Sequence, residues 1–202
     1  MALSTLYGVN GVGKDTIGAE LLSRHPDTQL TSESRLFMYI LGITSDYRAQ
    51  TKASREQYKQ LEDTPQKRML EIQDTDYMYL VDDLKKRENT TILLSHLVFA
   101  LHLDKEITYL DSRETPEWFV DANDTLVQLV APPEVILERR MQDAAQRDRG
   151  AFTLEDIQTH QRLCDRKWEK LTALAVNDTV CISVENINKD QAAEETEHAI
   201  FR

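Results

Sequence analysis

Short apolar runs alternate with longer amphipathic stretches along this chain, and the alternation predicts strands separated by helices. The runs that read as buried strands are residues 3–7, 29–31, 91–94, 125–130 and 179–184. Because helical patterns separate most of these runs, the strands are expected to pair in parallel. The pattern therefore predicts an α/β fold, with a parallel sheet of about five strands covered by helices on both faces.

The helical stretches carry start and stop signals. The expected helices lie near residues 14–25, 33–41, 51–63, 65–87, 115–118, 154–174 and 190–201. Ser32 is a predicted N-cap with Gly42 as the stop of the same helix, and Thr153 with Asp156 predicts a capped start for a later one. Residues 97–110 instead alternate between apolar and polar, which predicts an extended or hairpin-like insertion.

Residues 8–16 read Gly-Val-Asn-Gly-Val-Gly-Lys-Asp-Thr, directly after the first strand and before the first helix. That order is the context of a phosphate-binding P-loop, in which glycines let backbone N–H groups fold around a polyphosphate. Lys14 would neutralise the β- and γ-phosphates of ATP. The residues expected to line the nucleotide site here are Gly8, Asn10, Gly11, Val12, Gly13, Lys14, Asp15 and Thr16. The alternative is a glycine-rich turn without a ligand.

The position after the lysine departs from the usual pattern. A serine or threonine normally stands there and holds Mg²⁺, whereas this chain has Asp15, with the hydroxyl of Thr16 one residue later. An aspartate beside phosphates is repelled unless Mg²⁺ or an arginine compensates its charge. Asp15 and Thr16 are therefore the candidate Mg²⁺ ligands.

Composition narrows the class of protein. The chain has 202 residues, a formal net charge of -11 and two unclustered cysteines, and we expect one domain over residues 1–202. The negative charge argues against a nucleic-acid partner, and no apolar run is long enough for a membrane span. We expect a cytoplasmic protein without a secretory signal or structural zinc.

Two sets of cationic side chains could meet phosphates. Arg139, Arg147 and Arg149 lie on or after one helix, where they could form a lid over ATP or, alternatively, pair with neighbouring acids on a solvated helix. Arg35 and Arg55 are candidates for an acceptor phosphate, although each could be an ordinary surface arginine.

His96 follows the strand at 91–94, at the edge of an α/β sheet where ligands bind. It could contact an acceptor or a Mg²⁺-bound water, or it could be a hydrogen-bonded structural histidine.

Together these residues resemble the archaeal-type adenylate kinases, within the P-loop nucleoside monophosphate kinases. The resemblance rests on residues 8–16, Arg139-Arg140, Asp143, Arg147-Asp148-Arg149, His160-Gln161 and the stretch 55–61. It implies a three-layer P-loop nucleotide-kinase fold with an acceptor-binding helical region at about 32–88 and a small arginine-rich lid at about 139–152. It also implies ATP, Mg²⁺, a nucleoside monophosphate acceptor such as AMP, and Asn186 near the adenine. Members are often homo-oligomers, which this sequence does not itself show.

The chain also departs from that family after its central strand. The family has an acidic residue where this chain has Leu94, before Ser95 and His96, and the 97–110 segment lacks the family's acceptor loop. Three functions follow as hypotheses. The first is transfer of the ATP γ-phosphate to a nucleoside monophosphate. The second is a P-loop kinase for another small acceptor, with His96, Ser95 or Glu33 contacting a hydroxyl. The third is a nucleotide-binding regulatory protein with little turnover.

Overall fold

The structure is a computed structural model, and it describes residues 2–42, 74–103, 106–111, 117–144, 152–175 and 178–201. The strands are β1 (Leu3–Tyr7), β2 (Gln29–Ser32), β3 (Thr91–Leu94), β4 (Val98–Leu103), β5 (Glu106–Asp111), β6 (Thr125–Val130) and β7 (Val180–Glu185). The helices are α1 (Lys14–Arg24), α2 (Glu33–Ile40), α5 (Asp74–Lys85), α6 (Glu117–Ala122), α7 (Pro133–Ala144), α8 (Leu154–Leu174) and α9 (Lys189–Ile200).

Five strands form one parallel sheet in the order β2-β3-β1-β6-β7, as the apolar runs predict. All five residues of β1 are buried, because this strand lies in the middle of the sheet between two helical layers. Leu6 at the end of β1 pairs with Leu94 at the end of β3. The loop after β1 and the residues after β3 therefore leave the sheet at the same edge.

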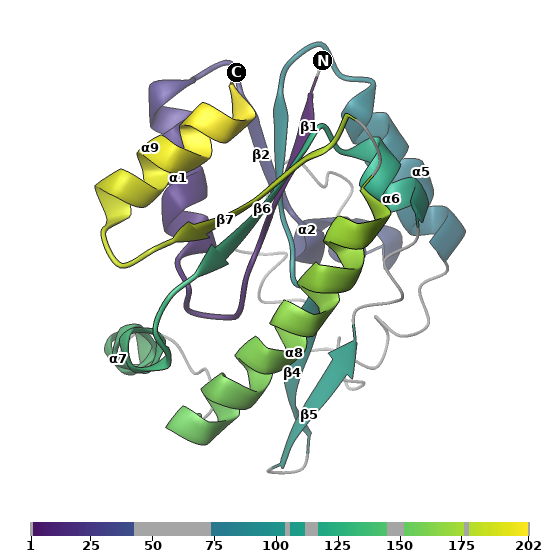
Figure 1. Ribbon diagram of the computed structural model, residues 1–202. Helices are drawn as coiled ribbons and strands as arrows, with labels where there is room; N and C mark the ends of the chain where they lie inside the picture. Colours follow the sequence, from purple (N-terminus) through teal and green to yellow (C-terminus); the bar gives the residue numbers. More distant parts are fainter. Residues whose placement is uncertain are drawn as a thin grey trace.

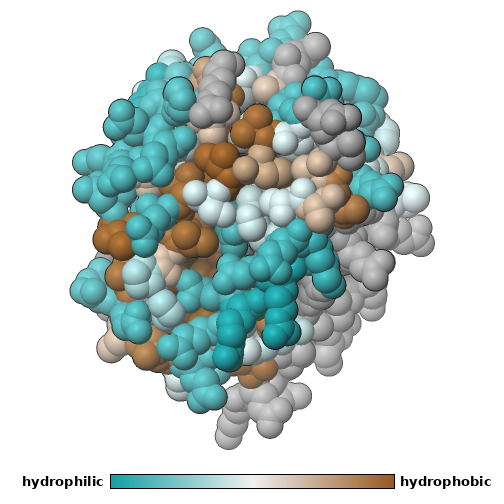
Figure 2. Space-filling view, in the orientation of Figure 1, coloured by the Kyte–Doolittle hydropathy of each residue, from teal (hydrophilic) through white to brown (hydrophobic). Residues whose placement is uncertain are grey.

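Helices cover both faces of the sheet (Figure 1). α1 and α9 pack against each other on one face, while α5, α6 and α8 lie on the other. The edge strand β7 runs between α9 and α8, and its residues Val180, Cys181 and Ile182 are only half-buried. Apolar surface appears in this region between the two helices (Figure 2).

The predicted insertion at 97–110 is a hairpin. β4 and β5 pair antiparallel as a separate two-stranded sheet, with Val98 opposite Asp111 and Leu103 opposite Glu106. Figure 1 shows this hairpin projecting beyond the carboxyl ends of the main sheet, next to α8. It begins three residues after Ser95, so it borders the edge from which the glycine-rich loop also leaves.

The start signals have mixed outcomes. Thr153 and Asp156 form the predicted capping box at the start of α8. Ser32 occupies the N-cap position of α2 but makes no side-chain cap, because its hydroxyl bonds to Ser34 Oγ at 3.0 Å instead. The helices predicted at 51–63 and the start of the one at 65–87 lie outside the described residues. Among the described helices, none has the length and apolar character needed to cross a membrane.

Candidate active site

The loop between β1 and α1 has the backbone shape that its glycines allow. Gly11 and Gly13 have φ values of 91° and 102°, in the left-handed region that side chains rarely adopt. A Cβ on Gly13 would lie 2.6 Å from Asn186 Nδ2, and one on Gly8 would lie 2.8 Å from the carbonyl oxygen of Leu129. The loop is therefore packed tightly on its outer side, and its neighbours leave no room for a larger residue at these positions.

Lys14 is the first residue of α1, and its side chain folds back over the loop. Its ammonium group donates to the carbonyl oxygens of Gly8 at 2.5 Å and Val9 at 3.3 Å. Only 8% of Lys14 is exposed. The charge is thus held at the centre of the loop, at the amino end of a helix, where the helix dipole also favours an anion.

Arg139 on α7 closes one side of the loop. Its guanidinium donates to the carbonyl oxygens of Val12 at 3.1 Å, Asn186 at 2.8 Å and Ile187 at 3.4 Å. The side-chain amide of Asn186 donates to the same Val12 oxygen at 2.8 Å. Arg139 and Asn186, 47 residues apart in the chain, are therefore brought together at the end of the loop.

Asn186 itself is 3% exposed, and its Oδ1 has no hydrogen-bond partner among the described residues. A buried amide oxygen without a partner is costly, so it suits a position where a ligand donates a hydrogen bond. The 6-amino group of adenine is such a donor. The position near the adenine that the sequence resemblance implies for Asn186 stays a prediction.

The neighbouring Arg140 supports the loop from behind. Its guanidinium donates to the carbonyl oxygen of Asn10 at 3.2 Å and lies 3.6 Å above the centre of the Phe152 ring. Arg140 is only 7% exposed. The sequence pattern does not distinguish Arg140 from Arg139, because the burial of Arg140 against the loop can be seen only in the structure.

On the β3 side, a buried carboxylate lies beside the loop. Glu33, the first residue of α2, is 6% exposed, and its Oε2 accepts from Ser95 Oγ at 2.9 Å and from the backbone N–H of His96 at 3.0 Å. The short connection from β2 to α2 and the end of β3 place these groups together, since β2 and β3 are neighbours in the sheet. One carboxylate oxygen is thereby fixed by two donors.

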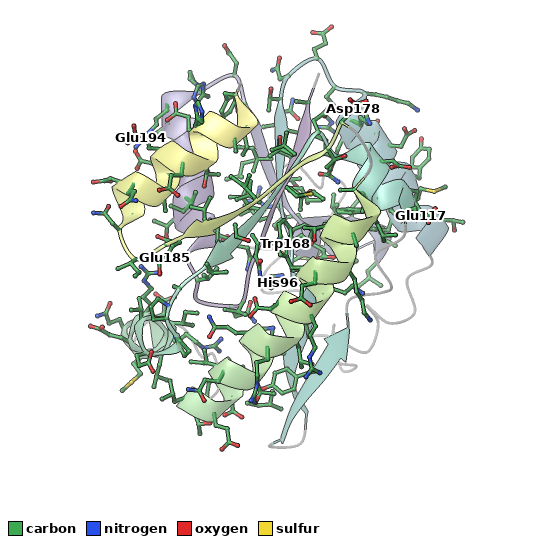
Figure 3. All side chains as sticks on the ribbon, in the orientation of Figure 1. His96, Glu117, Trp168, Asp178, Glu185 and Glu194 are labelled. Atoms are coloured by element: carbon green, nitrogen blue, oxygen red, sulfur yellow. The ribbon has the colours of Figure 1, made fainter. Side chains whose placement is uncertain are left out.

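His96 joins this carboxylate to the loop. Its Nε2 lies 2.6 Å from Asn10 Oδ1, and its Nδ1 lies 4.0 Å from Glu33 Oε2. With Asn10 Oδ1 as the acceptor, Nε2 carries the hydrogen and Nδ1 presents its lone pair. Loss of hydration holds the pKa of His96 well below its usual range, and the positive charge of Lys14 lowers it further. Figure 3 labels His96 at the carboxyl-terminal edge of the sheet.

The hairpin is tied to α8 close to this point. His160 Nε2 lies 2.7 Å from the carbonyl oxygen of Val98, and the hydroxyl of Tyr109 donates to the carbonyl oxygen of Asp156 at 2.8 Å. Burial lowers the pKa of His160 to about 4, so the ring is neutral and donates to Val98. The sequence resemblance placed His160 in a family motif, and its contact in this structure is with the hairpin.

A Mg²⁺ ion would find few protein ligands here. Asp15 and Thr16 lie in the first turn of α1 and both are exposed. No cluster of three or more His, Cys, Asp or Glu side chains suited to a metal occurs in the part of the chain that the structure describes. This donor set fits Mg²⁺ held mainly by phosphate oxygens and water, with Asp15 or Thr16 as protein ligands.

Of the two predicted acceptor arginines, Arg35 lies among the described residues, and the role of both stays a prediction. Arg35 donates to the carbonyl oxygen of Leu30 at 3.1 Å, along β2. Arg55, Arg147 and Arg149 lie outside the described residues, so their roles and that of the 139–152 lid remain predictions. The described groups at the site are thus the loop with Lys14, Arg139 and Asn186 on one side, and Glu33, Ser95 and His96 on the other.

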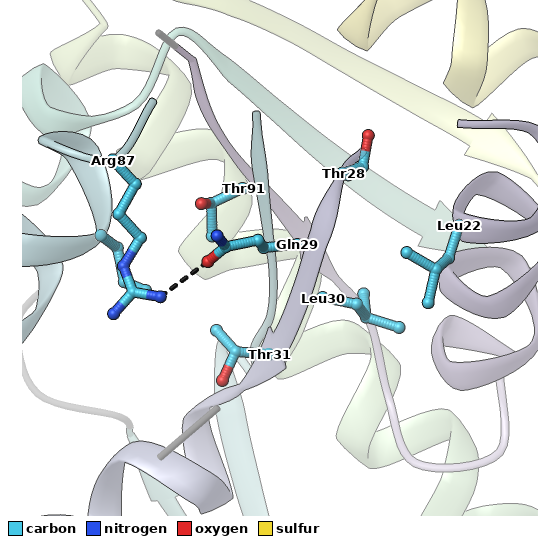
Figure 4. A pocket seen from close by; sticks show the side chains of 8 residues that line it. Leu22, Thr28, Gln29, Leu30, Thr31, Arg87 and Thr91 are labelled. Atoms are coloured by element: carbon cyan, nitrogen blue, oxygen red, sulfur yellow. Dashed lines mark hydrogen bonds between the residues drawn. The ribbon is translucent and has the colours of Figure 1, made fainter. Parts of the chain in front are cut away.

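A hollow of about 200 Å³ lies beside the first residues of β2 and β3, away from the loop (Figure 4). Its lining includes Gln29, Arg87 and Thr91. Arg87 donates to Gln29 Oε1 at 2.6 Å and pairs with Asp83 at 3.1 Å. The glycine-rich loop leaves β1 at the opposite edge of the sheet, where Leu6 pairs with Leu94 at the end of β3, so this hollow is separate from the candidate site.

No protein-family profile and no curated protein matches this sequence. Its structure is similar to that of shikimate kinase from Acinetobacter baumannii in complex with shikimate, with a TM-score of 0.54, 14% identity, and coverage of 98% of this chain and 92% of that one. Shikimate kinase from Aquifex aeolicus gives a TM-score of 0.53 at 18% identity, covering 98% of this chain and 96% of that one. Shikimate kinase from Bacteroides thetaiotaomicron also gives 0.53, at 12% identity, covering 100% and 99%.

These similarities confirm the P-loop kinase fold that the sequence predicts. The named neighbours are shikimate kinases rather than nucleoside monophosphate kinases, so the likeness extends to the wider fold and not to the archaeal-type adenylate kinases in particular. At this level of identity the comparison concerns the fold, and any activity must be argued from the site.

Proposed function

We propose that this protein is an ATP-dependent phosphotransferase that moves the γ-phosphate of ATP to a hydroxyl group of a small metabolite. The donor half of the proposal is supported by the P-loop, in which the glycine backbone and Lys14 would hold the phosphates. Arg139 and Asn186 would border the nucleotide, and Asp15 and Thr16 would help to hold Mg²⁺. The similar fold of the shikimate kinases agrees with this donor.

The observation that carries the acceptor half is the buried carboxylate of Glu33 beside the loop. A carboxylate disfavours a phosphate dianion placed beside it, and Oε2 of Glu33 is held at this position by Ser95 Oγ and the His96 backbone N–H. A hydroxyl group of the acceptor suits this position better, because it can donate a hydrogen bond to the carboxylate and lose that proton as its oxygen attacks phosphorus. The proposed acceptor is therefore an alcohol.

Phosphoryl transfer needs few other functional groups from the protein. Phosphoryl transfer depends mainly on bringing the two oxygens into line and on neutralising charge that spreads over the moving group. Lys14 supplies that charge at the loop. Asp15 and Thr16 would help to hold Mg²⁺, which when bound would supply further neutralisation of the phosphate charge. Glu33 would orient the acceptor hydroxyl.

A nucleoside monophosphate acceptor remains the second candidate. It is favoured by the Arg139-Arg140 pair on α7, which matches the lid motif of the archaeal-type adenylate kinases, and by the cationic residues of the 139–152 stretch. In that case Arg35, Arg55 and His96 would hold the acceptor. The two candidates differ in one testable respect, which is whether the accepting atom is a hydroxyl or a phosphate oxygen.

A mass-spectrometric transfer assay distinguishes them. The purified protein, ATP and Mg²⁺ are offered polyols, sugars, sugar acids, nucleosides and shikimate in one series, and all ribo- and deoxyribonucleoside monophosphates in another, with Lys14→Ala as the control. We expect a phosphate monoester of an alcohol that is absent with Lys14→Ala. A nucleoside diphosphate formed in its place would identify the second candidate. ATP binding without transfer to any acceptor would favour a regulatory protein.

A further inference from the structure

Tyr7 is the last residue of β1, directly before the P-loop, and its side chain lies on the acceptor side of the site. Leu6 pairs with Leu94, and the backbone N–H of Ser95 donates to the Leu6 carbonyl oxygen at 2.9 Å, so Tyr7 and Ser95 are the next residues opposite each other. Residues opposite each other in neighbouring strands direct their side chains to the same face of a sheet. Because Ser95 Oγ donates to Glu33 at 2.9 Å, Tyr7 shares this face with the Glu33 carboxylate.

A row of polar side chains continues from Tyr7 across the sheet. Tyr7 pairs with Gln128 of β6, and Gln128 pairs with Ser183 of β7. The Gln128 side chain accepts from Ser183 Oγ at 3.1 Å and donates to Asp165 of α8 at 2.9 Å. Ser95, on the other side of Tyr7, also has its hydrogen-bond partner. The Tyr7 hydroxyl differs from its neighbours in the row, because it makes no hydrogen bond with any residue that the structure describes.

The Tyr7 ring is held firmly, yet its hydroxyl can be reached. The ring centre lies 6.4 Å from that of Phe119 on α6 and 6.1 Å from that of Trp168 on α8. Tyr7 is 2% exposed, and Oη belongs to that exposed part, since it is not among the unpaired polar atoms sealed from solvent in the described ranges. A fixed hydroxyl that lacks a protein partner and stays accessible suits a contact with a ligand.

This hydroxyl is a hydrogen-bond donor at neutral pH. Burial raises the pKa of Tyr7 well above its usual value, and the negative charge of Glu33, followed by that of Cys181, raises it further. The effect of Glu33 agrees with the placement of both groups on one face of the sheet. A tyrosine that keeps its proton can donate to an oxygen atom of a bound molecule.

We propose that the Tyr7 hydroxyl donates a hydrogen bond to a second oxygen atom of the acceptor, beside the hydroxyl that attacks phosphorus. The acceptor is then a polyol, a sugar or a hydroxy acid, and Tyr7 determines specificity without taking part in the transfer itself. A simple alcohol would leave the buried hydroxyl without a partner and cut off from water, which lowers its affinity. This inference rests on the proposed transfer of phosphate to an alcohol.

Two series of acceptors test whether a second oxygen is needed. The wild-type protein with ATP and Mg²⁺ is offered glycerol, sorbitol, myo-inositol and shikimate in one series, and propanol, hexanol and cyclohexanol in the other, with phosphate monoesters detected by mass spectrometry. We expect transfer to a member of the first series, with kcat/KM at least about 100-fold higher than for any simple alcohol. Equal kcat/KM for the two series would overturn the inference and leave the proposed function intact.

Tyr7→Phe tests the residue itself, because it removes the hydroxyl and keeps the ring. We expect KM for the acceptor found in the first series to rise about 10-fold, while kcat and the Kd for ATP stay within about threefold. The Tm should not fall, since the hydroxyl has no described partner to lose, whereas a structural role would lower it. Tyr79→Phe, at a residue of α5 that is 72% exposed, is the matched control.

Each outcome bears on a different part of the account. An unchanged KM in Tyr7→Phe would overturn the inference alone. If that variant fails to fold, the comparison of the two series in the wild-type protein decides. ATP binding without transfer to either series would overturn the inference together with the alcohol acceptor of the proposed function.

Discussion

The guanidinium group of Arg139 and the side-chain amide of Asn186 donate to the same acceptor, the carbonyl oxygen of Val12, at 3.1 and 2.8 Å. Arg139 comes from α7 and Asn186 from the residue after β7. The Val12 carbonyl oxygen is therefore held by two segments of the chain, α7 and the residues after β7. We interpret these two hydrogen bonds as the contacts that fix the conformation of the loop.

Removing that contact should weaken nucleotide binding. In Arg139→Ala the loop loses one charge-assisted hydrogen bond and the site loses a positive charge, so the Kd for ATP should rise by about 10- to 100-fold. Calorimetric titration measures this, with Arg162→Ala on the exposed face of α8 as the matched control. Equal ATP affinities for the two variants would exclude a nucleotide-side role for Arg139.

A methyl group at Gly13 should be far more harmful than one at Gly42. Both residues have positive φ, 102° and 69°, so both substitutions carry backbone strain of about 1–2 kcal/mol. Gly13→Ala also drives a Cβ to within 2.6 Å of Asn186 Nδ2, whereas no atom of the described residues lies within 4 Å of a Cβ at Gly42. We expect Gly13→Ala to abolish ATP binding and Gly42→Ala to leave it unchanged. Thermal unfolding and ATP titration of both variants check the prediction.

Glu33→Gln should impair the acceptor side alone. The amide keeps an oxygen for Ser95 and the His96 backbone, but it cannot take a hydroxyl proton, so kcat should fall by about 100-fold or more. The Kd for ATP should stay within about threefold of the wild-type value. Glu134→Gln, an exposed position in the first turn of α7, is the control for transfer assays. A kcat unchanged in Glu33→Gln would remove the main support for an alcohol acceptor.

The sequence predicted the main sheet and the P-loop because both depend on local patterns. Apolar runs of four to six residues separated by helical periods predict buried parallel strands. Glycines that follow a strand closely, here Gly11 and Gly13, indicate loop positions with positive φ. The alternating stretch at 97–110 likewise predicted the hairpin of β4 and β5. These elements need no knowledge of which distant residues meet.

The acceptor side was harder to predict, because it is assembled from segments far apart in the chain. Glu33 and Ser95 are 62 residues apart, and only the pairing of β2 with β3 brings them together. The sequence marked His96 by its position at a strand end, but it gave no sign of the contact with Asn10. The same holds for Arg140, whose burial behind the loop depends on where α7 packs.

The pH dependence of stability should carry the signature of His160. Its pKa is about 4 in the folded protein, below the value of about 6.5 expected when unfolded, so the unfolded state binds more protons between these values. The contribution of the neutral His160 ring to the free energy of unfolding is complete above pH 6.5. About 3 kcal/mol of it is lost as the pH falls towards 4. In denaturant titrations, His160→Gln should reduce the acid-induced loss of stability by up to that amount. Parallel pH profiles for the two proteins would contradict a buried neutral His160.

Tyr109→Phe should loosen the hairpin without touching the P-loop. The variant loses the hydroxyl that donates to the Asp156 carbonyl oxygen at 2.8 Å, which should cost about 1 kcal/mol of stability. Hydrogen exchange should increase in β4 and β5, while the Kd for ATP should not change. Unaltered exchange in the hairpin would show that this hydrogen bond does not hold the hairpin against α8.

The central claim is that the loop after β1 binds the phosphates of ATP through Lys14, and calorimetric titration of ATP with Mg²⁺ tests it most directly. Wild-type protein and Lys14→Ala are compared at the same pH and salt, with ADP and AMP titrated in parallel. The account predicts that affinity falls in the order ATP, ADP, AMP for the wild-type protein, and that Lys14→Ala weakens ATP binding by about 100-fold with little effect on AMP. ATP affinity that is absent from the wild-type protein, or that survives unchanged in Lys14→Ala, would contradict it.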